Sequence, residues 1–581
     1  MDGAARWVAS ALIGHPEIAV LLAVGSGFAL GQVRVRSVSL GAVTGTLLVG
    51  VALGVVVRLP DTGAGRTTLV VDGPARNIFF LLFLFALGVR LGPQFVAGLR
   101  GTGAPQALFA VVLAVVGFAT VLGVAAAFGL NPGLAAGVAG GALTQSAIVG
   151  VAQGSIAGLG ADASTLQEWS DLVPVAYAVT YLFGTVGTAL YCANIAPRLL
   201  GITALPAAAA ALEERLGLAG SAPDVHSAYL DVTRRAYLLT ALPDGVRTCG
   251  DLETYLETRA GGGQRVYVAR VRTGDTVRDA DPGTVLAAGG TVALTARRMD
   301  LFADALAPVA HETDDRRLLD FGIEDLWVMV SHRGAAGRTV GELRTDGRFR
   351  RIYVRALRRG GHDVPLADPV TLHAGDEVRV QGPQPLLEQT IPSIGHAERS
   401  DDRSGMVAIG LGIAAGALVG VPALHAGGIP VGLSTSVGAL LAGLLLGWFR
   451  TRRPITARIP AATDWFLESA GLAFFIAMVG ISAGPSFLSG LTRYGVGILL
   501  AGVVVTLVPL LVMTALSRWV FRFDPVLTLG MLAGARSSSA AAGAVRDAAR
   551  SSAPMLGYTV PYAVANVALT IGGAVVVALT G

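Results

Sequence analysis

The sequence predicts an α-helical polytopic membrane protein built from two inverted repeats, with a small α+β insert between them. Three observations support this fold class. Hydrophobic residues make up 53% of the chain and charged residues only 14%, whereas soluble domains carry roughly a quarter charged residues. Apolar segments fall into two groups separated by a charged stretch. Motifs of the first group recur in the second group.

The apolar segments form two sets of six. They lie near 17–33, 38–57, 77–89, 104–130, 132–153 and 172–195, and near 405–423, 431–449, 465–482, 494–517, 525–545 and 558–580. A helix needs about 20 apolar residues to cross the hydrocarbon core. The third segment of each set is short or interrupted, and the fifth is rich in Gly and Ser. We expect about ten crossings and two re-entrant segments, the latter being the fifth of each set.

Internal matches indicate a duplication. Residues 87–95 match 479–487, with two glycines, a proline and a phenylalanine in register, and residues 141–150 match 534–543. The two offsets are 392 and 393 residues. The dipeptides Val173-Pro174 and Val560-Pro561 follow at similar distances. Three ordered matches predict that each half folds in the same way.

The placement of arginine predicts the topology, because cytoplasmic loops are enriched in basic residues. In the second half, arginines follow the second, fourth and fifth segments. They are Arg450, Arg452, Arg453, Arg458, Arg518, Arg522, Arg546 and Arg550. The fifth segment thus has arginines on one side at both ends, as expected of a re-entrant segment. Arg58, Arg66 and Arg76 depart from the pattern in the first half. Twelve full crossings with parallel halves remain the alternative.

The composition changes between the two halves. We divide the chain into a first membrane repeat (1–204), two α+β modules (205–310 and 311–400) and a second membrane repeat (401–581). Charged residues become frequent in the middle part, and alternating apolar residues there are typical of strands. The insert follows a crossing that ends inside, so we expect it to be cytoplasmic.

The fifth segments carry the candidate binding site. The first offers Thr144, Gln145 and Ser146, and the second offers Ser537, Ser538 and Ser539. Broken helices near the bilayer midplane expose backbone groups that bind ligands, and helix N-termini favour anions. The alternative interpretation is that the small residues serve only close helix packing.

Arg536 is a charge in an apolar segment, where the equivalent position of the first half is Leu143. A charge in the bilayer usually faces a cavity or a partner, and a guanidinium matches a carboxylate in a bidentate geometry. We expect Arg536 to contact an anionic substrate. The alternative is an arginine that snorkels to the membrane surface.

Glycine and proline interrupt the third segments, where we expect hinges or helix ends. The residues concerned are Gly88, Gly92, Pro93, Gly480, Gly484 and Pro485.

Several chemistries lack their motifs. The chain contains no lysine and therefore no phosphate-binding Gly-x-x-x-x-Gly-Lys loop. It has no dinucleotide-binding glycine fingerprint and no Cys/His metal cluster, and its net charge of +4 is small and dispersed. We expect no enzymatic activity, no cofactor, no metal site and no nucleic-acid partner.

Residues 141–146 and 534–539, with the paired Gly-x-x-x-Gly-Pro turns, resemble the aspartate–alanine exchanger family of bacterial inner-membrane carriers. The resemblance covers nearly the whole chain. In the insert, residues 337–343 through 374–378 resemble the RCK_C modules of potassium-transport regulators. The resemblance implies exchange or export of small amino acids or dicarboxylates such as aspartate, alanine or succinate. Ala147 and Ala540 stand where this family often has proline, which leaves the local backbone and the substrate open.

The leading functional hypothesis is a secondary carrier for small carboxylates that works by alternating access. An elevator-like motion of the re-entrant segments against a homodimeric scaffold is one form of it. The alternatives are an ion channel or cation transporter gated by the insert, and a membrane sensor that signals through the insert. We expect the insert to be regulatory or to join subunits, with room for a small-molecule ligand.

Overall fold

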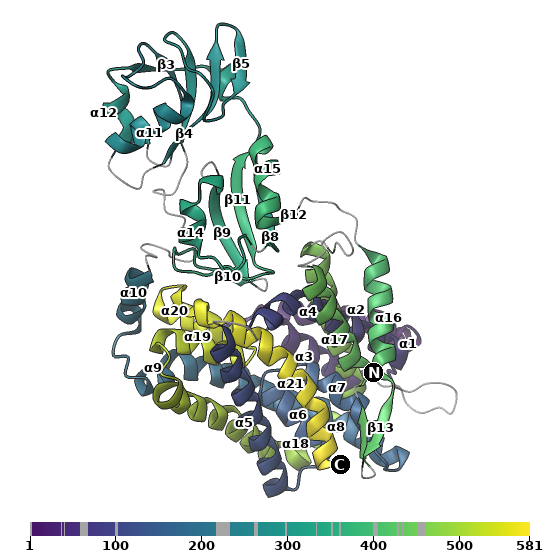
Figure 1. The fold of residues 1–581 in the computed structure, drawn as a ribbon. Coiled ribbons are helices and arrows are strands. Elements are labelled where there is room, and N and C mark those ends of the chain that lie inside the picture. The colour runs from purple at the N-terminus through teal and green to yellow at the C-terminus, as the bar shows by residue number, and fades with distance from the viewer. Residues whose placement is uncertain are drawn as a thin grey trace.

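A helical part and an insert of two small sheets make up the molecule (Figure 1). The computed structural model describes residues 3–35, 38–39, 41–57, 68–98, 103–216, 233–260, 265–296, 299–332, 334–349, 352–359, 362–398, 405–426, 429–432, 434–450, 459 and 461–581. Arg58, Arg66, Arg452, Arg453 and Arg458, which bear on the predicted topology, lie outside these residues.

The two halves of the helical part contain corresponding elements. The first half consists of α1 (Gly3–Gly14), α2 (Pro16–Gly31), β1 (Arg34–Val35), β2 (Val38–Ser39), α3 (Ala42–Val56), α4 (Gly73–Gly98), α5 (Ala104–Phe128), α6 (Pro132–Ala142), α7 (Ala147–Ile156), α8 (Ala163–Leu190), η2 (Tyr191–Ile195), α9 (Ala196–Leu199) and α10 (Leu205–Leu216). The second half consists of α16 (Met406–Gly420), β13 (Ala423–Ala426), β14 (Ile429–Gly432), α17 (Thr435–Arg450), α18 (Ala461–Leu516), η7 (Ser517–Phe521), α19 (Pro525–Ala535), α20 (Ser539–Ala549), η8 (Ala553–Gly557) and α21 (Thr559–Thr580).

Long apolar helices make this a multi-pass membrane protein. Among the described residues, 5 helices are long and apolar enough to cross a membrane, or 6 if α1 and α2, bent by 103°, form one span. The third and fourth apolar segments of the second half lie in one helix, α18, which runs over 56 residues with Pro485 and Pro509 inside it, and the expected number of crossings stays a prediction. Neighbouring helices in a membrane let proline stay within a helix.

The helix ends that the sequence predicts at the Gly-Pro motifs do not occur in α4 or α18. Helix α4 continues past Pro93 to Gly98. A Cβ on Gly92 would lie 2.3 Å from the Leu444 carbonyl oxygen of α17, and one on Gly480 would lie 2.7 Å from the Leu47 carbonyl oxygen of α3.

Gly88 and Gly484 face backbone atoms of α17 and α3 in the same way. These glycines therefore permit close helix crossings. Each crossing joins the third-segment helix of one repeat to the second-segment helix of the other repeat, so the repeats interlock.

The insert contains two five-stranded antiparallel sheets with the same strand order. The first sheet, β5-β4-β6-β3-β7, is built from β3 (Thr233–Leu239), β4 (Val266–Thr273), β5 (Thr276–Asp279), β6 (Thr291–Ala296) and β7 (Ala310–Thr313), with helices α11 (Cys249–Arg259) and α12 (Ala303–Leu306). The second, β10-β9-β11-β8-β12, is built from β8 (Ile323–Val330), β9 (Tyr353–Arg359), β10 (His362–Val364), β11 (Glu377–Pro383) and β12 (Gly395–Glu398), with α14 (Val340–Thr345) and α15 (Gln384–Ile394). The expected boundary at 310 falls inside β7, which pairs with β3.

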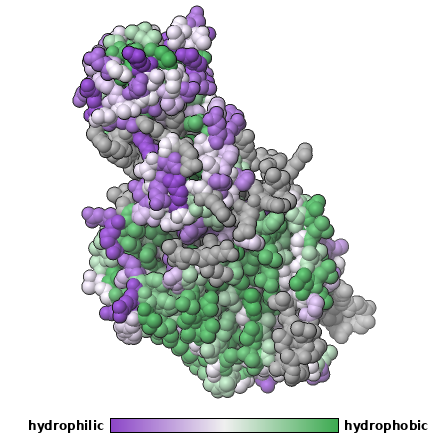
Figure 2. Space-filling view, viewed as in Figure 1, coloured by the Kyte–Doolittle hydropathy of each residue, from purple (hydrophilic) through white to green (hydrophobic). Residues whose placement is uncertain are grey.

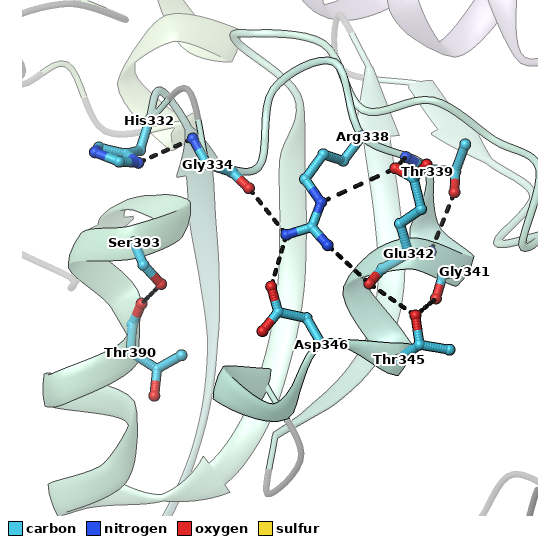
Figure 3. A network of polar contacts seen from close by, with 10 residues as sticks. All are labelled: His332, Gly334, Arg338, Thr339, Gly341, Glu342, Thr345, Asp346, Thr390 and Ser393. Atoms are coloured by element: carbon cyan, nitrogen blue, oxygen red, sulfur yellow. Dashed lines mark hydrogen bonds and ion pairs between the residues drawn. The ribbon is translucent and has the colours of Figure 1, made fainter.

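Local hydrogen bonds explain the start of α14 in the second module (Figure 3). The Thr339 hydroxyl accepts from the N–H of Glu342, and the Glu342 carboxylate accepts from the N–H of Thr339. This reciprocal cap satisfies two free donors at the helix start. Arg338 bridges the ends of the helix, because it pairs with Asp346 at 2.7 Å and donates to the Glu342 carbonyl at 3.0 Å.

The second module is seated on the end of α4. The side-chain amide of Gln94 donates to the Gly375 carbonyl at 3.2 Å. Gly375 has φ +90, and a Cβ there would lie 2.0 Å from the Cβ of Pro93. Leu216 and Leu556 pack against the hydrophobic core of the module. Helix α10 therefore bridges the helical part and the insert.

The surface changes character where the two parts meet. Figure 2 shows hydrophobic residues over much of the visible face of the helical part, and mainly hydrophilic residues on the insert. Exposed large apolar side chains such as Val115, Leu418 and Val496 lie on α5, α16 and α18. This pattern fits a helical part in lipid and an insert in water.

Candidate functional site

The first broken helix folds back on itself. Helices α6 and α7 are 11 and 10 residues long and are separated by a four-residue connection. Near the start of α6, a Cβ on Gly133 would lie 2.0 Å from the carbonyl oxygen of Trp169. Near the end of α7, the Gln153 side chain donates to the carbonyl of Ser170 at 3.2 Å. Both ends of the unit thus meet the same turn of α8, so the chain reverses between them. We call α6, α7 and their connection hairpin 1.

The second broken helix, α19 and α20, also folds back on itself, and both of its ends contact α10. Just before α19, Asp524 pairs with Arg215 at 2.6 Å. Just after α20, the Ser551 hydroxyl donates to the carboxylate of Glu213. Both partners lie on α10, two residues apart, so α19 and α20 also turn back on each other. We call this unit hairpin 2.

The tips of the two hairpins share an unusual backbone. Thr144 has φ 59 and Ser537 has φ 46, and both are in the left-handed region that residues other than glycine rarely adopt. The N–H of Thr144 bonds to the Gly141 carbonyl, and the N–H of Ser537 bonds to the Gly534 carbonyl. In each tip the next N–H bonds to the carbonyl five residues back, at 2.8 and 3.1 Å. The tips are therefore equivalent in geometry as well as in sequence.

The two tips are in contact with each other. The Thr144 hydroxyl donates to the carbonyl of Arg536. The Ser537 hydroxyl donates to the carbonyl of Thr144 at 3.4 Å. The structure thus brings Thr144 into contact with two predicted site residues, Arg536 and Ser537, that lie 392 and 393 positions later in the sequence.

Arg536 lies fully buried behind this contact, with an exposed fraction of 0%. Its guanidinium donates to the Thr506 carbonyl of α18 at 3.3 Å, to the Thr188 hydroxyl of α8 at 3.4 Å, and to the Ala142 carbonyl that ends α6. Its Nε–H has no hydrogen-bond partner in the part of the chain that the structure describes. Among the described residues, no Asp or Glu oxygen lies within ion-pair distance of it. An unneutralised buried charge is costly, so this point of the molecule favours an anion.

The other predicted site residues surround the tips. The Gln145 side chain donates to the Asn566 side chain of α21 at 3.2 Å. The Ser146 hydroxyl lies 2.6 Å from the hydroxyl of Tyr177.

The two serines after Ser537 differ in environment. Ser538 caps α20 by accepting from the N–H of Ala541 at 3.2 Å, whereas Ser539 is exposed on the first turn of α20 and has no place in the tip contact.

Two tyrosine pairs lie beside the tips and are not among the predicted site residues. A Cβ on Gly141 would lie 2.6 Å from the Tyr177 carbonyl oxygen, and one on Gly534 would lie 2.3 Å from the Tyr558 carbonyl oxygen. Tyr177 therefore corresponds to Tyr558, with Tyr181 and Tyr562 one turn later, and each pair has neighbouring rings at 4.9 and 5.1 Å.

This correspondence shifts the match predicted between Val173-Pro174 and Val560-Pro561 by six residues. The signal available in the sequence was the repeated Tyr-x-x-x-Tyr spacing.

Two equivalent helical hairpins that meet inside a multi-pass helical domain are a feature of membrane transport proteins. Sequence comparison agrees with this class. Residues 19–197 and 408–578 match the Asp-Al_Ex family, described as Predicted Permease Membrane Region. The chain belongs to this aspartate–alanine exchanger type of permease family.

Relatives of similar length support the same class. An uncharacterized transporter of Bradyrhizobium diazoefficiens is 36% identical, and the match covers 91% of this chain and 99% of the length of that transporter. Uncharacterized transporters of Shewanella oneidensis and Bordetella parapertussis are 35% and 33% identical, over 98% and 97% of this chain and 99% and 97% of their own. No solved structure matches the chain significantly.

Proposed function

We propose that the protein is a secondary active transporter of small carboxylates in the bacterial inner membrane. Its substrates are amino acids or dicarboxylates of the size of aspartate, alanine or succinate. The observation that carries this proposal is the meeting of two equivalent hairpin tips over a buried guanidinium that has no counterion among the residues whose placement is described.

In this proposal the substrate carboxylate binds between the tips. Arg536 supplies the charge, and its Nε–H is a donor that no described residue uses. The hydroxyls of Thr144 and Ser537 exchange their contacts across the tips for contacts with the substrate. Gln145, Ser146 and Ser538 line the approach. The tips must part to admit substrate, so the structure corresponds to the closed arrangement of the site.

The two hairpins act as re-entrant segments from opposite sides. The base of hairpin 1 lies at Trp169 and Ser170, early in α8, and the base of hairpin 2 lies at α10, beyond the other end of α8. Inverted repeats give two equivalent packings that face opposite sides. We place the insert in the cytoplasm as a regulatory unit and assign a homodimeric scaffold against which the hairpins move.

Counterflow in proteoliposomes tests this function. Vesicles preloaded with unlabelled aspartate, alanine or succinate are diluted into labelled substrate. A carrier accumulates label transiently, and uptake without internal substrate is slower. Large unitary currents in planar bilayers, with no stimulation by internal substrate for any small carboxylate, would instead establish a channel.

A further inference from the structure

A second charged group lies inside the helical part, away from the hairpin tips. Arg90 of α4 and Glu468 of α18 form an ion pair, with 2.7 Å between Nη1 and Oε2. Their side chains are 23% and 17% exposed. The pair is therefore mostly buried within the helical part, although each side chain keeps some exposed area. The proposed substrate contacts make no use of it.

The ion pair joins the two repeats. Helices α4 and α18 also pack through two aromatic stacks, Phe79 on Phe474 and Phe80 on Phe475, with ring centroids 4.7 and 4.3 Å apart. Unlike these stacks, the ion pair depends on charge. Loss of the negative charge would weaken the attachment of α4 to α18 at one end only.

A chain of contacts connects this pair to hairpin 1. Arg90 donates to the hydroxyl of Tyr562 on α21 at 3.4 Å. One turn later on α21, the side chain of Asn566 donates to the Tyr562 carbonyl at 2.8 Å and accepts from Gln145 at 3.2 Å. Hydrogen bonds through Tyr562 and Asn566 therefore link Arg90 to Gln145 in the tip of hairpin 1.

The surroundings of the pair favour reversible protonation. The ionisable groups around it are Arg90 on α4, Tyr562 and Tyr558 on α21, and Asp464 one turn before Glu468 on α18. Two carboxylates thus share the region with one guanidinium. When Glu468 is neutral, Arg90 still has the hydroxyl of Tyr562 as a hydrogen-bond partner and the carboxylate of Asp464 nearby.

We propose that Glu468 is the proton-binding site that couples this transporter to the proton gradient. Arg90 lies one turn before Gln94, which contacts Gly375 of the second module, so the proton-binding site lies near the end of α4 that faces the insert. Protonation converts the Glu468 carboxylate to the neutral acid and breaks the ion pair with Arg90. Helix α4 is then released from α18 at that end. This inference rests on the proposed transport function and names its coupling ion.

The test follows protons and substrate in the same proteoliposomes. A pH-sensitive dye trapped inside reports proton movement while an imposed substrate gradient drives net flux, and counterflow is measured in parallel. We expect wild type to move protons with substrate. Glu468→Gln should retain counterflow and lose substrate-driven proton movement. The matched control, Glu17→Gln, removes an exposed carboxylate of α2 that is not one of these groups and should retain both.

A double variant guards against misfolding of the single one. Arg90→Gln with Glu468→Gln removes both charges and leaves two side chains that hydrogen-bond, and it should also exchange substrate without moving protons. Wild-type counterflow without proton movement would overturn this inference alone. Proton movement that persists in both glutamine variants would also overturn it. Absence of counterflow in wild type would remove the transport function itself.

Discussion

Thr144 and Ser537 hold a backbone conformation that glycine adopts at much lower cost. The left-handed region costs a residue with a Cβ about 1–2 kcal/mol. Each of the two side chains reaches the opposite tip through its hydroxyl. Strained residues of this kind often mark functional positions. At the residue scale, the tips keep hydroxyl side chains, which we propose bind substrate, at the expense of backbone stability.

This balance predicts different stabilities for two small substitutions at Ser537. Both Ser537→Ala and Ser537→Gly remove the hydroxyl, but only glycine relieves the left-handed strain. We expect Ser537→Gly to be more stable than Ser537→Ala by about 1 kcal/mol, which appears as a higher Tm in detergent. Equal melting temperatures would mean that the tip is not left-handed in solution.

The sequence singles out Arg536 as a candidate site residue but does not predict its hydrogen-bond partners. A lone charge in an apolar repeat is visible from sequence. The oxygens that it contacts belong to the backbone at Ala142 and Thr506, and a backbone carbonyl leaves no trace in the residue type. The contact of Gln145 with Asn566 likewise arises only when α21 packs beside hairpin 1.

At the scale of elements, glycine can either break a helix or permit a close crossing of two helices, and the sequence does not distinguish these two roles. The sequence predicts hinges or helix ends at the motifs around Gly92 and Gly484, whereas α4 and α18 continue through them without a break. A glycine beside proline resembles a break in any single segment. Its role in a crossing depends on the other helix, which lies in the opposite repeat. The duplication, by contrast, can be predicted because it is a property of the sequence itself.

A pair of glycine substitutions tests the interlocked crossings. A Cβ on Gly92 would lie 2.3 Å from the Leu444 carbonyl oxygen, whereas a Cβ on Gly123 of α5 meets nothing within 4 Å. We expect Gly92→Ala to lower the Tm of the purified protein markedly, because two backbones must separate. Gly123→Ala should be neutral or stabilising by about 0.5–1 kcal/mol. A Gly92→Ala protein as stable as Gly123→Ala would contradict the crossing.

For the whole molecule, the central question is how the insert contacts the helical part. Sequence predicts two similar modules and locates them between the repeats. It does not predict that α10 packs with hairpin 2, or that a turn of the second module rests on Pro93. These are contacts between surfaces far apart in the chain, and the residues involved have no special composition.

The two modules of the insert have equivalent glycines, so the first module serves as a control for the contact between the second module and the helical part. Gly289 and Gly375 precede equivalent strands and have φ +82 and +90, but only Gly375 meets the helical part. We expect Gly289→Ala and Gly375→Ala to carry the same local strain of about 1 kcal/mol. Only Gly375→Ala should increase hydrogen exchange at the end of α4 around Gln94. Equal protection of this segment in both variants would argue against the docked arrangement.

The role of Arg536 is tested most directly by substrate affinity, measured by titrating purified protein and following its thermal shift. Arg536→Leu should lose about 2–5 kcal/mol of binding to its best carboxylate, and Arg536→Lys should keep a weak fraction because it preserves the charge without the fork. The control, Thr506→Val, removes the hydroxyl bond to the same Ala142 carbonyl but leaves the cation, and should bind nearly as wild type. Wild-type affinity in a folded Arg536→Leu protein, or an equal loss in Thr506→Val, would contradict a substrate contact by Arg536.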